Sequence, residues 1–379
     1  GESGALPGLT VRDEKTLEIR LVAPSATFLT RLASVPTSIV DVADAANDPV
    51  SWWQSPNATG PFVIESIDPE LLVLRPNPHY GDATKRLQRI EFLLGLSAIN
   101  PLNLYQDDAI DVVANASGEG SKLIDDPASQ VEAVVTRVPL FATSYIAFGN
   151  TTEPLDDVHI RRALQLLVSQ DLVAYSMFAG TVEAATGMIP TGMLGREWSS
   201  SLPTQDFDAA RRELSLSRFG VAEAVPTISI FAADIEPVAM LRDLAALELG
   251  ITIEAIEVRW EDFLAGLVER RFPAYALYWG ADYPDPEAML GMLFKSDGTD
   301  NYVGYVNADF DAILDQARRK AVPELRASLY EEAQNLLIAD AGIIPLYFDR
   351  GVTVSRPGVE GLAVTPLGIL GLELVTMNP

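Results

Sequence analysis

A regular alternation of strand and helix patterns between residues 227 and 279 constrains the fold of this chain most. Three apolar strand patterns and two helix patterns follow one another at 227–231, 236–249, 251–258, 260–270 and 274–279. Strands joined by helices in this way form a parallel sheet with right-handed crossovers. Ligands of such sheets gather at the carboxyl ends of the strands. The residues that follow Trp279 are therefore the first place to look for a binding site.

Other segments add strands and helices on either side of this unit. Apolar alternation predicts strands, and capping residues at helical spacing predict helices. We expect strands at 16–23, 62–66, 71–75, 89–94, 110–113, 143–148 and 343–348, with 62–66 and 71–75 as a hairpin. We expect helices at 28–32, 160–168 (capped by Asp156 or Asp157), 208–220 (opened by Asp208), 309–319 and 323–340. The predicted class is α/β.

Charge and residue usage exclude several functions. The 379 residues include 53 acidic and 27 basic side chains, so the net charge is −26. Such a surface repels phosphate, and we expect neither nucleic acid nor a polybasic contact with a membrane. The chain has no cysteine and two histidines, which excludes thiolate chemistry and His-rich metal sites. We therefore expect no cofactor and no metal.

No stretch is long and apolar enough for a transmembrane helix. The most apolar segment, 363–375, is interrupted by Pro366, Gly368 and Gly371. Residues 1–16 have neither the basic start nor the apolar run of a signal peptide. If the protein is exported, we expect its signal or lipid anchor upstream of this chain.

The sequence WGADYPDP at 279–286 carries the strongest candidate for chemistry. Asp282 would stand just past a buried strand, where a carboxylate is costly without a cation or several donors. A ligand ammonium would serve, with Trp279 and Tyr283 as apolar walls. Two alternatives remain open: Asp282 and Asp285 shape turns before the prolines, or they act as the carboxylate pair of a hydrolase. Trp260 is either core or pocket wall.

Eight segments in collinear order resemble one protein family. They are TGPF at 59–62, LRPNPHY at 74–80, DDVHIRRAL at 156–164, WGADYPDP at 279–286, NYVGY at 301–305, FD at 310–311, LYEEAQ at 329–334 and IPLY at 344–347. Together they are similar to the solute-binding proteins of family 5 of ABC importers, which include oligopeptide- and dipeptide-binding proteins. The resemblance implies a type II periplasmic-binding-protein fold with mixed or parallel sheets. Lobe I would hold 1–141 and 348–379, and lobe II 142–347, joined by crossings near Tyr145 and Tyr347.

The resemblance also implies a function and its residues. Peptides would be captured between the lobes, outside the cytoplasm, by a monomeric protein that is not an enzyme and that delivers them to an ABC permease. Asp282 would hold the α-ammonium, and Gly280 would offer main-chain groups. Side-chain contacts would come from Trp279, Trp260, Tyr283, Tyr145, Asn115 and Tyr347.

The sequence departs from the family pattern in two ways. Members are usually longer, and the first recognisable segment here is the strand at Thr16, so we expect an incomplete lobe I with an exposed apolar edge near 16–23 and 343–348. Ala276 stands where some oligopeptide binders carry an arginine for the ligand carboxylate, which leaves the other end of the ligand undefined. Another small solute, a sugar or cationic compound, and an interaction module without a ligand site remain alternatives. A nickel ligand is disfavoured, because the chain has only two histidines and no cysteine.

Overall fold

The largest element of the fold is a seven-stranded mixed sheet. The structure is a computed structural model that describes residues 7–81, 87–96, 99–114, 132–178, 181–199 and 202–378. The strands lie in the order β10-β9-β11-β7-β12-β6, and β8 pairs with β12. Their bounds are β6 Val112–Val113, β7 Val134–Phe148, β8 Glu183–Ala184, β9 Ile228–Ala232, β10 Ile253–Glu257, β11 Ala274–Gly280 and β12 Ile343–Ser355.

The predicted parallel unit is confirmed. Strands β9, β10 and β11 run parallel, whereas β7 pairs antiparallel with both β11 and β12. The crossovers are α8 (Glu236–Leu244) and α9 (Trp260–Val268). The first crossover differs from the prediction, because the α-helix gives way to a π-helical turn over Ala245–Leu249 before it ends at Gly250, whose φ is 73°.

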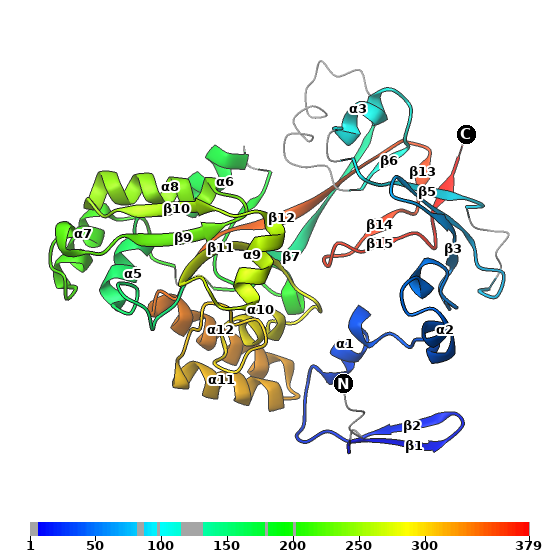
Figure 1. The fold of residues 1–379 in the computed structure, drawn as a ribbon, viewed down its shortest axis with the longest axis horizontal. Helices are drawn as coiled ribbons and strands as arrows, with labels where there is room; N and C mark the ends of the chain where they lie inside the picture. Colours follow the sequence, from blue (N-terminus) through cyan, green and yellow to red (C-terminus); the bar gives the residue numbers. More distant parts are fainter. Residues whose placement is uncertain are drawn as a thin grey trace.

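Helices on the two faces of this sheet bury two separate cores. Alternate residues of a strand point to opposite faces, and so Tyr145 of β7 joins one core while Ile146 joins the other. The first core lies under α9, α10 (Glu287–Phe294), α11 (Ala308–Arg319) and α12 (Pro323–Ala339), and the second under α5 (Val158–Gln165), α6 (Gln170–Phe178), α7 (Phe207–Leu216) and α8. Figure 1 shows α10, α11 and α12 on one side of the sheet and α6 and α8 on the other.

Helix starts follow the predicted caps with one correction. The Asp157 carboxylate accepts from the His159 N–H at 2.9 Å and caps α5, as one of the two expected aspartates. The cap of α7 is Asp206 rather than Asp208. Asp206 has extended backbone and accepts from the Ala209 N–H, whereas Asp208 lies in the first turn, where an acid suits the helix dipole. That helix ends at Leu216, short of Gly220.

Two long strands carry the chain from this α/β lobe into a second lobe. These strands are β7 and β12. In the second lobe they pair with each other, and β12 also pairs with β6. A small core there includes Leu102 of α3 (Pro101–Gln106). The second lobe also holds a sheet of β3 (Phe62–Ile67), β4 (Leu71–Pro76) and β5 (Ile90–Leu93), and the pairs β13 (Val359–Glu360) with β16 (Thr376–Met377) and β14 (Ala363–Val364) with β15 (Leu370–Gly371). Figure 1 shows β7 and β12 spanning the two lobes.

The N-terminal segment forms short elements at the edge of the molecule. They are β1 (Leu9–Asp13), β2 (Thr16–Ile19), α1 (Phe28–Leu32) and α2 (Val42–Asn47). Leu17, Leu21 and Val22 are exposed, as the expected apolar edge near 16–23 requires. The expectation for 343–348 is wrong, because β12 lies inside the sheet between β7 and β8 and nearly all of this stretch is buried. Within the described ranges, no helix combines the length and apolarity needed to span a bilayer.

Candidate functional site

An exposed acid follows the end of β11. Asp282 stands two residues after Gly280, and its side chain has no ion-pair or hydrogen-bond partner among the described residues. Partial burial raises the pKa of its carboxyl, and the negative charge of Asp300 raises it further. A carboxylate held in this way is stabilised by an incoming cation, because the attraction of the cation opposes the effects of burial and of Asp300.

Asp300 adds negative charge beside Asp282. Its carboxylate accepts hydrogen bonds from the Tyr302 hydroxyl and the Thr299 hydroxyl, each at 2.6 Å. No lysine or arginine in the described part of the chain forms an ion pair with either acid. The two carboxylates therefore give the end of β11 a negative potential that neighbouring side chains do not neutralise.

A cavity of about 280 Å³ lies at the end of β11, next in the chain to Asp282, and is also lined by residues of β7, β12 and the β14–β15 hairpin. Tyr278, Gly280 and Ala281 border it from β11 and the residue after it. The rest of the lining comes from Ala114, Leu140, Phe141, Ala142, Gly351, Val364, Pro366, Leu367, Gly368 and Leu370. Because β7 and β12 link the lobes here, the cavity lies at the junction between them.

The expected site residues separate into surface and interior positions. Gly280 lines the cavity, and Trp260 is exposed at the start of α9, so it is not a core residue. Trp279 is half-buried; its indole N–H donates to the Ala288 carbonyl at 3.1 Å, and its ring packs on the first core. Tyr347 is half-buried with its ring centroid 4.4 Å from that of Phe178.

Two expected contact residues lie in the interior. Tyr145 is fully buried, with its ring edge-on to Tyr275 at 6.3 Å. Tyr283 is also buried, and the Arg31 guanidinium lies 5.9 Å from its ring centroid. Burial raises the pKa of both phenols. These positions support the site through packing and do not face its cavity. Asn115 lies outside the described residues, although its neighbour Ala114 lines the cavity.

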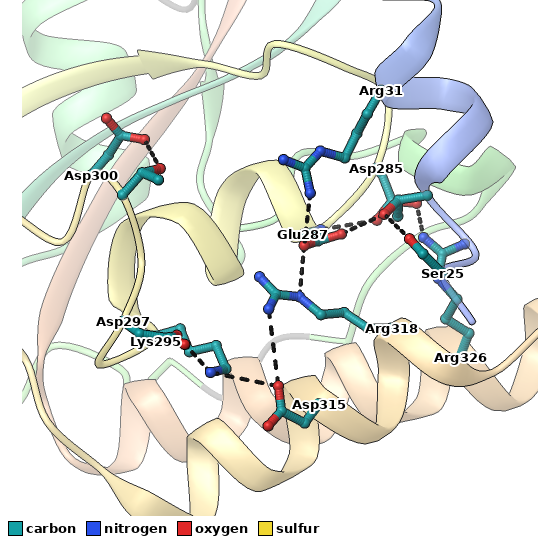
Figure 2. Close-up of polar contacts among 12 residues, drawn as sticks. Ser25, Arg31, Asp285, Glu287, Lys295, Asp297, Asp300, Asp315, Arg318 and Arg326 are labelled. Atoms are coloured by element: carbon teal, nitrogen blue, oxygen red, sulfur yellow. Dashed lines mark hydrogen bonds and ion pairs between the residues drawn. The ribbon is translucent and has the colours of Figure 1, made fainter. Parts of the chain in front are cut away.

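The second acid of the WGADYPDP segment is structural. Asp285 is 3% exposed, forms an ion pair with Arg326, and accepts from the Glu287 N–H at 3.0 Å. Figure 2 shows Asp285 and Glu287 inside a network of arginines, with Asp300 apart from it. Because Asp285 points inward and Asp282 does not, the pair lacks the shared face that a two-carboxylate hydrolase requires.

The N-terminal segment contributes to the same network, which sequence patterns did not predict. The buried Thr27 hydroxyl donates to the Glu287 carboxylate at 2.7 Å, and the Arg318 Nε donates to the same carboxylate at 2.7 Å. The Ala26 N–H donates to the Arg318 carbonyl at 3.0 Å. No local signal connects Thr27 with α10, because the contact depends on residues far apart in the chain.

Two further residues near the cavity were also not predicted. Tyr278 is paired with Ser144, and Ser144 with Tyr347, so the three side chains share one face of the sheet. Partial burial and the charge of Asp349 raise the pKa of Tyr278 to about 12. Burial also raises the pKa of Asp349, whose carboxylate accepts from the Arg350 N–H at 2.8 Å. The available signal was the alternation of β11, which places Tyr278 on the same face as Gly280.

Comparison with known proteins identifies relatives over most of the chain. The family model for bacterial extracellular solute-binding proteins, family 5, matches residues 3–301. The probable deoxycholate-binding periplasmic protein YgiS of Escherichia coli (strain K12) is 26% identical and matches 93% of this chain. The periplasmic oligopeptide-binding protein OppA of the same strain is 24% identical, also over 93%. The chain spans 67% of the length of each of these two proteins.

Solved structures show the same fold. The periplasmic binding protein DppA from Helicobacter pylori, in complex with the peptide STSA, has a TM-score of 0.83 at 18% identity; the match covers 98% of this chain and 74% of that one. The dipeptide-binding protein from Pseudoalteromonas sp. SM9913, in complex with Met-Leu, has a TM-score of 0.81 at 19% identity and covers 98% and 75%. The predicted two-lobed class is thereby confirmed.

Proposed function

We propose that this chain, which belongs to the bacterial extracellular solute-binding proteins of family 5, captures peptides by their free amine and carries them to a membrane permease. One observation carries the proposal. Asp282 is an exposed carboxylate with a raised pKa and no cationic partner among the described residues, and it stands beside a cavity at the junction of the lobes. Several relatives bear the names of peptide-binding periplasmic proteins.

Capture follows from electrostatics and closure. The α-ammonium of a peptide binds Asp282, with Asp300 adding to the attraction. Movement of the lobes about β7 and β12 then excludes water and strengthens that attraction. Main-chain groups near Gly280 pair with the extended peptide, as in strand addition. Trp260 is an exposed aromatic side chain that a closed form could place against the ligand, and the Trp279 indole is held by its hydrogen bond to the Ala288 carbonyl.

The proposed lobe boundaries follow the pairing of the long strands. Lobe I comprises 1–141 and 348–379, and lobe II comprises 142–347. Ala142 is the first residue of β7 that pairs with β11, opposite Gly280. The ladder between β12 and β7 is irregular between Pro345 and Tyr347 and again between Phe348 and Arg350. Such bulges bend a strand, which suits a crossing between lobes.

The partner and place of action follow from the family. We propose a monomer that works outside the cytoplasm with the permease of an ABC importer, and a carrier rather than an enzyme. The inward position of Asp285 supports this reading, because Asp285 is then not available as the partner carboxylate of Asp282. A small cationic solute is the second candidate ligand, since Asp282 and Asp300 lack cationic partners in the described part of the chain.

Binding of matched peptides tests the proposal. Titration calorimetry would compare a free-amine peptide with its N-acetylated form on the protein and on its Asp282→Ala variant. We expect Asp282→Ala to weaken binding of the free-amine peptide far more than binding of the acetylated peptide. Glu257→Ala is the control, because Glu257 is an exposed acid at the carboxyl end of β10, another parallel strand of the same sheet. Equal losses for both peptides would remove Asp282 from the anchor role, and binding of a diamine but no peptide would favour the second candidate.

A further inference from the structure

The cavity beside Gly280 is closed on one side by the turn between β14 and β15. The Gly368 N–H donates to the Thr365 carbonyl at 2.8 Å, and the Thr365 N–H donates to the Ile369 carbonyl at 3.0 Å, which tightens the turn. The Pro366 carbonyl accepts from the Phe141 N–H at 2.7 Å, so the turn is tied to β7. Leu367 packs against the first core. The turn is thus a fixed wall of the cavity.

The side chains that line the cavity are mainly apolar. Its side chains are alanine, leucine, phenylalanine, valine and proline, together with the one polar ring of Tyr278, and none of them is charged. The volume of about 280 Å³ exceeds the 150 Å³ or so at which an apolar cavity in another protein stays dry and binds benzene. The space therefore suits one large apolar group better than a charged one, which would lose its hydration without gaining a partner.

Gly280 opens this space from the strand. A Cβ atom added at Gly280 would meet no other atom within 4 Å, although the residue ends a paired strand. The empty volume therefore begins directly over the main chain, two residues before Asp282. Two residues of a strand span about 6.6 Å, so a peptide whose amine binds Asp282 places the side chain of its first or second residue within reach.

We propose that this cavity, bounded by the 365–368 turn, is a specificity pocket for an apolar side chain in one of the two ligand residues nearest the free amine. The inference rests on the proposed function and names the class of peptide that the same site selects. Leucine- or phenylalanine-sized side chains fill the pocket. Aspartate and glutamate are rejected, because no basic side chain lines it.

A peptide series tests the pocket on the full chain. Tripeptides of glycine would carry alanine, leucine, phenylalanine or glutamate at position one or at position two, and titration calorimetry would measure each Kd. We expect leucine or phenylalanine at one of these positions to bind about tenfold or more tightly than alanine there, as burial of a large apolar side chain implies. Glutamate at that position should bind more weakly than alanine.

Two variants connect the preference to the cavity. Val364→Trp would fill the pocket and abolish the preference for leucine while it leaves binding of triglycine. Leu370→Ala would enlarge the pocket and move the preference toward phenylalanine, which keeps the test valid if Val364→Trp does not fold. Similar Kd values for all side chains at both positions would overturn the pocket and leave the proposed function intact. Failure of every peptide, triglycine included, would overturn the proposed function and the pocket with it.

Discussion

Removal of the Arg326 guanidinium should strongly destabilise the protein. Arg326 is 8% exposed and its ion-pair partner Asp285 is 3% exposed. Arg326→Met keeps the bulk of the side chain but leaves a buried carboxylate without its cation. Breaking one side of a buried pair costs about 3–5 kcal/mol, far more than the net worth of the pair. Urea unfolding would measure the loss as a lower midpoint with an unchanged slope.

A double-mutant cycle shows whether the uncompensated charge is the cause. Asp285→Asn in the Arg326→Met background removes the buried charge and should restore most of the lost stability. The exposed pair Arg259–Asp262, at 79% and 58% exposure, is the control; Arg259→Met should cost less than about 1 kcal/mol. If Arg326→Met costs no more than Arg259→Met, or if the losses simply add, the buried pair does not hold the segment in place.

Three further results follow from the structure. Gly266→Ala should lower the free energy of unfolding by about 1–3 kcal/mol, because the added Cβ would overlap the Phe272 ring. Gly280→Ala, where an added Cβ meets no atom, should leave that free energy unchanged. Thermal unfolding would measure both, and equal effects would refute the packing argument. Asp157→Ala should cost about 1 kcal/mol through loss of the α5 cap, and an unchanged midpoint would contradict it. The raised pKa of Asp282 means that affinity for a free-amine peptide falls on acidification at a pH above the ordinary carboxyl value of 3.8. Calorimetry across pH would check this, since Asp282→Asn should give a flat profile.

Local patterns predicted most elements of the fold. Apolar patterns predicted the bounds of β9, β10 and β11 to within a few residues, because a buried strand requires apolar residues at regular positions. Caps were less certain, since Asp206 and Asp208 are both acceptable near a helix start and only backbone conformation separates them. Strand order was harder still. The burial of 343–348 depends on β12 lying between β7 and β8, which no local pattern encodes.

The site was predictable as a segment but not as a geometry. The position of Asp282 after a buried strand made it a candidate, and that role remains a prediction, while the inward turn of Asp285 depends on Arg326 of another helix. Pro366 and Gly368 were interpreted from the sequence only as breaks in its most apolar segment. Their second role, as the wall of a cavity beside Gly280, requires a contact between β7 and the C-terminal hairpin. Contacts of this kind join residues far apart in the chain and leave no periodic pattern in the sequence of either segment.

The outward direction of Asp282 and the inward direction of Asp285 result from the same turn. A tight turn, in which the Asp285 N–H donates to the Tyr283 carbonyl at 2.8 Å, separates the outward carboxylate from the inward one. The inward acid is held by Arg326, and Glu287 next to it by Arg318 and by Thr27 from the N-terminal segment. Under the proposed function, a segment fixed at these points holds Asp282 in place before the ligand arrives. Because less conformational freedom is then lost on binding, more of the attraction between carboxylate and ammonium appears as affinity.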